Sequence, residues 1–64
     1  MDGWKETRGA AQEFTRGDWR ITPALGGGWI LLFRGVQQGG SVDASGAGDR
    51  VYPSPEAAAA DARA

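Results

Sequence analysis

The feature that most constrains this chain is the apolar run Trp29–Phe33, which lies between glycines in the stretch "GGGWILLFRG". A strand in a sheet with one solvated face alternates apolar and polar residues, and this run does not. Its short length and its flanking glycines favour a strand over a helix. Three of its side chains point to one side and two to the other, and all five are apolar. We therefore predict that residues 28–34 form a central strand with both faces covered.

Two shorter segments are predicted to join this strand in an antiparallel sheet. In residues 18–22, "DWRIT", apolar and polar residues alternate, as is typical of a half-buried strand. The segment "RVY", residues 50–52, reads as a third strand, which Pro53 stops. Residues 37–49 contain few large apolar side chains and several glycines, which predicts a flexible loop. Residues 18–52 are thus expected to form a three-stranded meander.

The two ends of the chain are predicted to differ. Residues 54–64, "SPEAAAADARA", are typical of a helix, because Ser54 is a good N-cap and Pro55 suits the first helical position. Residues 1–12 favour either a short helix or an irregular arm, and residues 12–15 either end that arm or form a short strand. The expected fold is a single α+β domain of 64 residues, with a three-stranded antiparallel sheet followed by one C-terminal helix.

The small size of the core leads to an expectation about self-association. Domains of this length usually add disulfides, a metal or a partner. The chain has no Cys and no His, which excludes disulfides and nearly excludes a structural zinc site. One face of the central strand can take the Ala-rich helix, and the other needs Trp4 and Phe14 from the N-terminal arm or a second subunit. We therefore expect a two-fold dimer, formed through a sheet face or an edge strand.

The composition argues against an enzyme. Without His and Cys the chain lacks the commonest general base and the thiol nucleophile, and its serines have no base at a known motif spacing. We predict no catalytic residue, no cofactor and no metal; the loop "DASGAGD" departs from the EF-hand spacing. The tripeptide "RGD", residues 16–18, is better explained as a turn than as an integrin motif.

Location and membrane contact follow from the absence of long apolar segments. The start of the chain is polar and lacks the apolar region of a signal peptide. No run approaches the 18 or so apolar residues that a membrane helix needs. A cytoplasmic protein without a membrane partner is therefore expected.

Two binding functions stay open. Large aromatic residues, of types enriched at interfaces, favour a protein-binding module or inhibitor that occludes a surface of a larger protein or ribonucleoprotein complex. The candidate contacts are Trp4, Trp19 and Tyr52. The alternative is nucleic-acid binding by arginines on the sheet face. Its candidates are Arg16, Arg20, Arg34 and Arg50. The net charge of −1 weighs against this alternative, because phosphate contacts drive most nucleic-acid affinity.

The segment "VYPSPEAA", Val51 to Ala58, resembles the pattern x-F-x-T-x-x-E-A that closes the sheet and opens the helix in the arm-type DNA-binding domain of tyrosine integrases. The resemblance extends from Asp18 to Arg63 and implies a three-stranded sheet, a Trp-bearing central strand and DNA contacts from basic and polar residues of the sheet. The chain departs from that family in its acidic balance. By type alone, it is also similar to small accessory proteins of phages and mobile elements, such as anti-CRISPR inhibitors.

Overall fold

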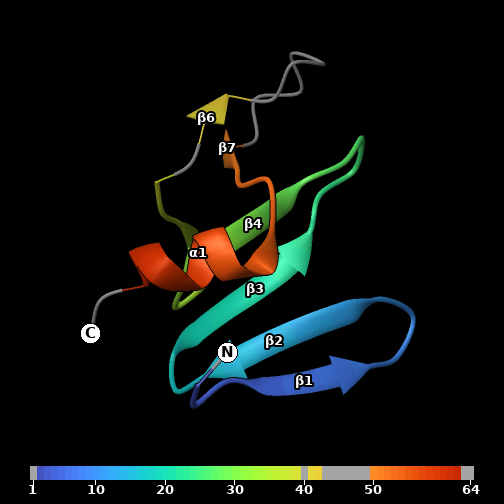
Figure 1. The fold of residues 1–64 in the computed structure, drawn as a ribbon, viewed down its shortest axis with the longest axis vertical. Coiled ribbons are helices and arrows are strands. Elements are labelled where there is room, and N and C mark those ends of the chain that lie inside the picture. The colour runs from blue at the N-terminus through green and yellow to red at the C-terminus, as the bar shows by residue number, and fades with distance from the viewer. Residues whose placement is uncertain (1, 40, 43–49, 63–64) are drawn as a thin grey trace.

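A five-stranded antiparallel sheet and one helix dominate the part of the chain that the computed structural model describes, residues 2–39, 41–42 and 50–62 (Figure 1). In chain order the elements are β1 (Lys5–Arg8), β2 (Gln12–Arg16), β3 (Trp19–Pro23), β4 (Trp29–Phe33), β5 (Val36–Gln37), β6 (Ser41–Val42), β7 (Arg50–Val51) and α1 (Pro55–Asp61). Strands β1 to β5 pair in sequence order, and β6 pairs with β7 in a separate two-stranded sheet. The α+β class and the C-terminal helix are confirmed, whereas the number of strands was predicted wrongly.

The N-terminal segment is a β-hairpin, so the prediction of a helix or an irregular arm over residues 1–12 is wrong. Lys5 pairs with Thr15 and Arg8 pairs with Gln12, which makes β1 an edge strand of the main sheet. Its four residues, KETR, are all exposed, and Thr7 is the one residue among them of a type enriched in strands. Pairing with β2 therefore overrides local propensity. The alternative of a short strand over residues 12–15 is confirmed by β2.

Two tight turns join the central strands. Gly17 and Asp18 connect β2 to β3, and Gly17 has a φ of 60°. Arg34 and Gly35 connect β4 to β5, with φ values of 52° and 82°. Two-residue hairpin turns require such positive φ values because they match the twist of the strands they join. The prediction that "RGD" belongs to a turn is confirmed.

The last strand segment closes the edge of β4 instead of forming a third strand of the main sheet. Arg50 and Val51 pair with β6, while Tyr52 exchanges two backbone hydrogen bonds of 2.9 and 2.7 Å with Trp29. A Cβ on Gly28 would lie only 2.9 Å from the Val51 Cβ, so this close approach requires glycine. Within the predicted loop 37–49, Gln37 and residues 41–42 belong to strands, and residues 40 and 43–49 lie outside the described part.

The helix begins as predicted. The Ser54 hydroxyl accepts a hydrogen bond of 3.1 Å from the Ala57 amide, and Pro55 occupies the first helical position. The helix ends at Asp61, and the predicted residues 63–64 lie outside the described part of the chain. Ala58 faces the sheet and is fully buried. Because its side chain is a single methyl group, the helix can approach the sheet closely.

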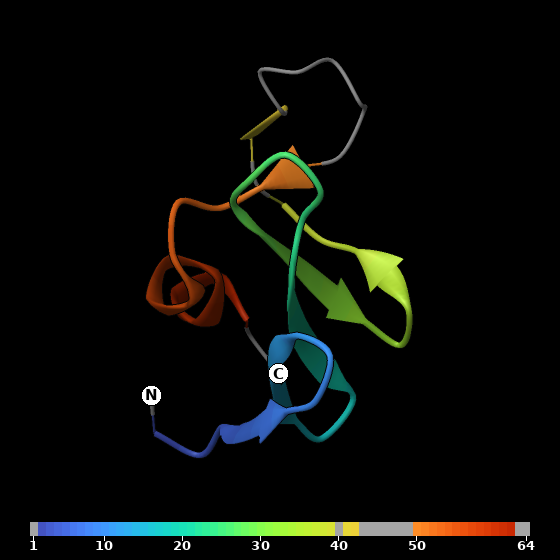
Figure 2. The ribbon, with the colours of Figure 1, turned by 90° about the vertical axis from the view of Figure 1, so that its right-hand side faces the viewer.

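Helix α1 lies on one side of the sheet (Figure 2), against β3 and β4. The core is formed there by Ile21, Leu31, Tyr52, Ala58 and Ala62, with Trp4, Phe14, Trp19 and Trp29 packed around them. Trp4 and Phe14 thus lie on the helix side, and the expectation that they cover the second face of the central strand is wrong. The reason is register: Phe14 pairs with Ile21, whose side chain points to the helix.

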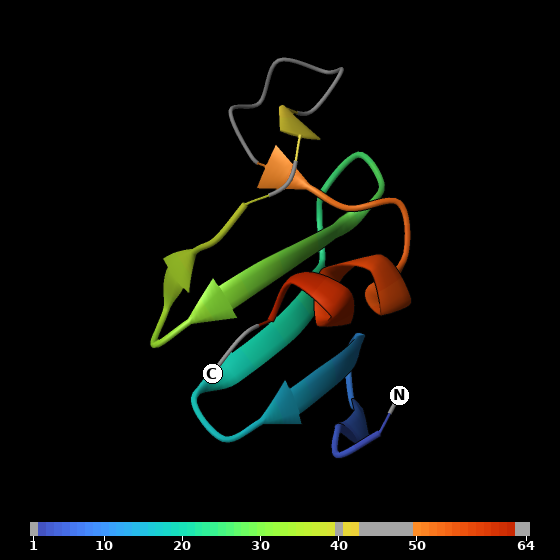
Figure 3. The ribbon, with the colours of Figure 1, turned by 60° about the vertical axis from the view of Figure 1, so that its left-hand side comes forward.

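We call the opposite side of strands β2 to β4 the open face (Figure 3), because no helix among the described residues lies against it. Strand alternation and register place six side chains there. These are Glu13, Thr15, Arg20, Thr22, Ile30 and Leu32. Ile30 and Leu32 are each half-buried by their neighbours in the sheet, and they give this face an apolar centre.

Candidate functional site

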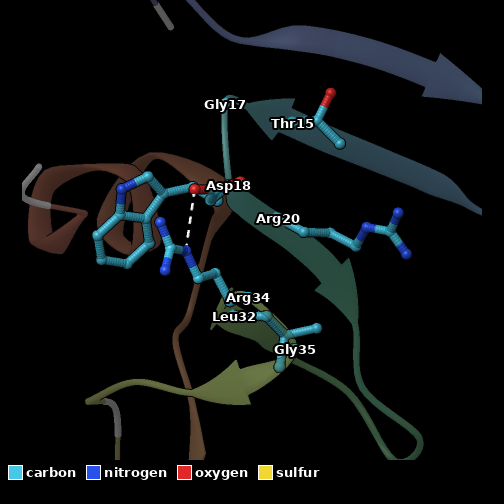
Figure 4. Close-up of a pocket in the computed structure, with 8 residues that line it drawn as sticks. Thr15, Gly17, Asp18, Arg20, Leu32, Arg34 and Gly35 are labelled. Carbon is cyan, nitrogen blue, oxygen red and sulfur yellow. Dashed lines mark hydrogen bonds and ion pairs between the residues drawn. The ribbon is translucent and has the colours of Figure 1, made fainter.

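The most structured surface feature is the end of the sheet where the two tight turns lie side by side, which we call the hairpin end. It consists of the turns Gly17–Asp18 and Arg34–Gly35 together with Trp19 and Phe33. The Arg34 amide donates a hydrogen bond of 3.0 Å to the Asp18 carbonyl, and the Arg34 Nε donates one of 3.1 Å to the Asp18 Oδ2 (Figure 4). The second turn is therefore fixed to the first by both backbone and side chain.

An aromatic pair lies next to this link. Trp19 and Phe33 face each other across β3 and β4, with ring centroids 4.7 Å apart and planes tilted by 50°. The Arg34 guanidinium carbon lies 5.3 Å from the Phe33 centroid, within range of a cation–π contact. Trp19 and Phe33 are both half-buried, so each ring keeps part of its surface exposed while its neighbours hold it in place.

Two hollows flank Trp19. One, of about 370 Å³, lies where the open face meets the hairpin end, and its lining mixes charged, polar and apolar groups. Its lining residues are Thr15, Gly17, Asp18, Trp19, Arg20, Leu32, Arg34 and Gly35. The other, of about 400 Å³, is more apolar. It is lined by Arg16, Gly17, Asp18, Trp19 and Phe33. The same indole thus forms a wall of both hollows, and a partner can reach it from either side.

The three aromatic residues predicted to contact a partner lie in different environments. Trp19 is at the hairpin end and half-exposed. Trp4 packs beside the core, under the Arg16 guanidinium, whose carbon lies 4.8 Å from the ring. Tyr52 is 6% exposed, and its hydroxyl donates a hydrogen bond of 2.8 Å to Asp61 Oδ2. Tyr52 is therefore part of the core and offers little surface to a partner.

The four arginines of the nucleic-acid hypothesis do not gather on one face. Arg16 points to the helix side, where its Nη2 donates a hydrogen bond of 2.9 Å to the Ala62 carbonyl. Arg20 lies on the open face, with its Nε 4.0 Å from the Glu13 carboxylate. Arg34 is held by Asp18 in the turn, and Arg50 is on β7 in the second sheet.

Residues that sequence reasoning missed are Asp18 and Phe33. The sequence marks Asp18 only as a turn former, yet its carboxylate fixes Arg34. Phe33 reads only as part of the apolar run, yet it holds Trp19 in position at the surface. One feature of the sequence could have identified both residues: Gly17-Asp18 directly precedes Trp19, and Arg34-Gly35 directly follows Phe33.

The site contains no arrangement typical of a metal centre. Among the described residues, no three Asp or Glu side chains come close enough together to hold a metal ion. The Asp18 carboxylate, the acidic group that lines both hollows, is already engaged by Arg34. The arrangement offers aromatic surface, hydrogen-bond donors and a fixed ion pair, which are the groups used in recognition.

The chain matches no known protein family, no curated protein and no solved structure. The resemblance to the arm-type domain of tyrosine integrases and the likeness in type to anti-CRISPR inhibitors therefore stay predictions. Within the described residues, no helix has the length and apolar character needed to cross a bilayer. The cytoplasmic location also stays a prediction.

Proposed function

We propose that this protein is a non-enzymatic protein-binding module, and that it contacts its partner through the hairpin end. The observation that carries this proposal is the position of Trp19, a half-buried indole between two hollows. Trp and Arg dominate the energetics of protein interfaces, and Trp19 has Arg20 and Arg34 beside it. An aromatic anchor of this kind contributes most to binding affinity when it is already held in its bound position before the partner arrives.

The rigidity of the hairpin end supports the same proposal. The Asp18–Arg34 ion pair and hydrogen bond, the two-residue turns and the Trp19–Phe33 contact all restrict motion before a partner arrives. Binding then loses little further side-chain entropy, which amounts to about 0.5–1.5 kcal/mol for each flexible side chain that is immobilised. A chain without His or Cys acts more readily by occupying a surface than by chemistry. We therefore propose an inhibitor that covers a surface of a larger protein or ribonucleoprotein complex, as anti-CRISPR proteins do.

Nucleic-acid binding is the weaker hypothesis on this geometry. A basic stripe on one face is the usual footprint of such proteins. Here Arg16 is tied to the core side, Arg20 and Arg34 each have a carboxylate beside them, and Arg50 is on the other sheet. The described arginines thus present no continuous positive surface to a phosphate backbone.

Site-specific photo-crosslinking tests the proposal. A photoreactive amino acid at Val36, which is 62% exposed and directly follows the Arg34–Gly35 turn, should trap one discrete protein when the full chain is expressed in cells. The matched control carries the same group at Ala60, on the exposed side of α1. Equal products from both positions, or no protein product from Val36, would contradict binding through the hairpin end. Crosslinked nucleic acid at Val36, with binding to duplex DNA that falls steeply with salt, would favour the alternative instead.

A further inference from the structure

We propose that the open face is covered by a second copy of this chain, in a two-fold dimer that stacks Leu32 on the partner's Ile30. The inference does not rest on the proposed function, because it is argued from the sheet register and is tested without a partner protein. The two surfaces share Thr15, Arg20 and Leu32, which also line the first hollow, so the dimer would cover that hollow and leave the second one open. It starts from the half-buried Ile30 and Leu32, which lie on the side of the sheet opposite to α1.

The edges of the main sheet are poor places for this association. On one side, β1 exposes only Lys5, Glu6, Thr7 and Arg8, and charged edge strands resist pairing with another chain. On the other side, the edge strand β5 has only two residues, and very short edge strands also resist pairing. The rest of the β4 edge is filled by the Tyr52 backbone and by the Gln38 amide, which donates a hydrogen bond of 2.9 Å to the Leu31 carbonyl. These edges therefore favour association through the open face over edge-to-edge pairing.

The register of the sheet makes the open face complementary to itself. Its side chains form two rows across the strands, because Thr15 and Leu32 both pair with Arg20, and Ile30 pairs with Thr22. We place a two-fold axis between the two facing sheets, perpendicular to the strands and midway between the two rows. This axis lays the Arg20 row of one copy over the Thr22 row of the other. Leu32 of one copy then meets the partner's Ile30, and the apolar centres of the two faces cover each other. Sheets that pack face to face in this way keep their strands within about 30° of each other.

The charges of the face follow the same symmetry. Glu13 extends the row of Thr22 and Ile30, and Arg20 belongs to the other row, so the two-fold brings each Arg20 near the partner's Glu13. Within one copy these groups lie 4.0 Å apart as an ion pair, and no hydrogen bond joins them. Their side chains are 56% and 35% exposed, so both are accessible to a second copy. The face thus carries one positive and one negative group, the pattern that an isologous interface needs.

The size of the face sets the expected strength of the dimer. Strands β2 to β4 have five residues each, so the face is roughly 17 Å long at about 3.3 Å per residue. Three strands at about 4.8 Å spacing give a width of roughly 15 Å. This area is well below the roughly 800 Å² per partner of a standard interface. We therefore expect a weak dimer that dissociates on dilution.

Charge exchange followed by sedimentation equilibrium tests the proposal. The full chain should rise from 6.7 kDa towards twice that mass between roughly 10 μM and 1 mM, the range over which a dimer with a dissociation constant of about 100 μM forms. Arg20→Glu and Glu13→Arg should each stay monomeric over this range, because like charges then face each other. An equal mixture of the two variants should regain the dimer, since both contacts across the mixed dimer then join a carboxylate to a guanidinium.

Further variants separate this interface from a general loss of solubility or folding. Leu32→Lys should abolish the rise in mass, whereas Leu25→Lys, at a leucine 89% exposed in the β3–β4 loop, should dimerise like the unmodified chain. Circular dichroism of each variant confirms that it is folded. A full chain that stays at 6.7 kDa at the highest concentration overturns the proposal. Single variants that dimerise as the unmodified chain does, or a mixture that stays monomeric while the unmodified chain dimerises, also overturn it.

Discussion

Leu31 and Leu32 are consecutive residues of one strand, yet they lie in two different regions of the molecule. Leu31 is 1% exposed and packs in the core beneath α1, together with Ile21 and Ala58. Leu32 is half-buried on the open face, beside Arg20. The apolar run in the middle of the sequence therefore serves two purposes: its odd-numbered residues stabilise the monomer, and its even-numbered residues supply the surface that we assign to a second copy.

The difference between the two faces follows from the size of the chain. The helix has seven residues, about 10 Å at 1.5 Å per residue, and it covers part of one face only. Its small side chains let it lie close to the sheet, so a few large residues suffice to close that side. The N-terminal hairpin adds Trp4 and Phe14 to the same side. Nothing in the described chain is then left to cover the opposite face.

The largest effect that separates the faces is expected from two matched leucine truncations. Leu31→Ala should lower the free energy of unfolding by about 2–5 kcal/mol, because it leaves a cavity in a fully packed core. Leu32→Ala should lower it by about 1 kcal/mol or less at protein concentrations where the chain is monomeric. Urea unfolding followed by tryptophan fluorescence measures both. Equal losses for the two variants would show that the open face is part of the core.

An enlarged side chain on the helix should sharpen the same contrast. Ala58→Leu places three further carbon atoms where α1 meets the sheet, and overpacking of this kind costs about 1–3 kcal/mol. Ala60→Leu makes the same change on the exposed side of the helix and should alter stability by about 0.5 kcal/mol or less. Thermal unfolding measures the two variants side by side. A Tm for Ala58→Leu equal to that of Ala60→Leu would mean that the helix does not pack tightly.

The N-cap tests the helix-covered face without touching the open one. Ser54→Ala removes the hydroxyl that accepts the Ala57 amide and should cost about 1 kcal/mol. Ser54→Asp keeps an acceptor at the cap and should stay close to the unmodified stability. Neither change should alter the concentration dependence of the mass. A loss of the dimer in Ser54→Ala while the helix stays folded would contradict the separation of the two faces.

The smallest effect is expected at the β1 edge, away from both faces. The hydrogen bond from Arg8, together with one from Gln12, holds the pKa of the exposed Glu6 carboxyl below its usual value. A lowered folded-state pKa means that this carboxylate contributes stability above its unfolded pKa, and that the contribution is lost as the pH falls through the folded value. Arg8→Gln should raise the Glu6 pKa in an NMR titration. An unchanged pKa would show that the contact does not persist in solution.

Sequence reasoning succeeded where local signals decide the structure. The Ser-Pro-Glu start of the helix, the Gly17–Asp18 turn and the apolar β4 run each carry their own short-range signal, and each was predicted. It failed where pairing between segments decides. Three of residues 5–8 are charged and all four are exposed, so their pattern does not predict a strand, and pairing with the neighbouring β2 makes them one.

The site shows the same division. Trp19 could be selected from its residue type, but Tyr52 could not be excluded, because its burial depends on contacts with Gln38 and Asp61, distant in sequence. The grouping of arginines on one face also failed, since it assumed that Arg16 shares the face of Arg20. Strand alternation places Arg16 with Phe14, on the helix side. The missing information was therefore which side of the sheet each arginine side chain points to.

One NMR measurement tests most directly the claim that the two faces differ in function. Each face carries one isoleucine and one leucine from the central strands: Ile21 and Leu31 under the helix, Ile30 and Leu32 on the open face. In a dilution series of methyl-labelled protein, the signals of Ile30 and Leu32 should shift with concentration, while those of Ile21 and Leu31 stay in place. Signals that all stay fixed, or that all shift alike, would contradict an account in which one face is core and the other is an interface.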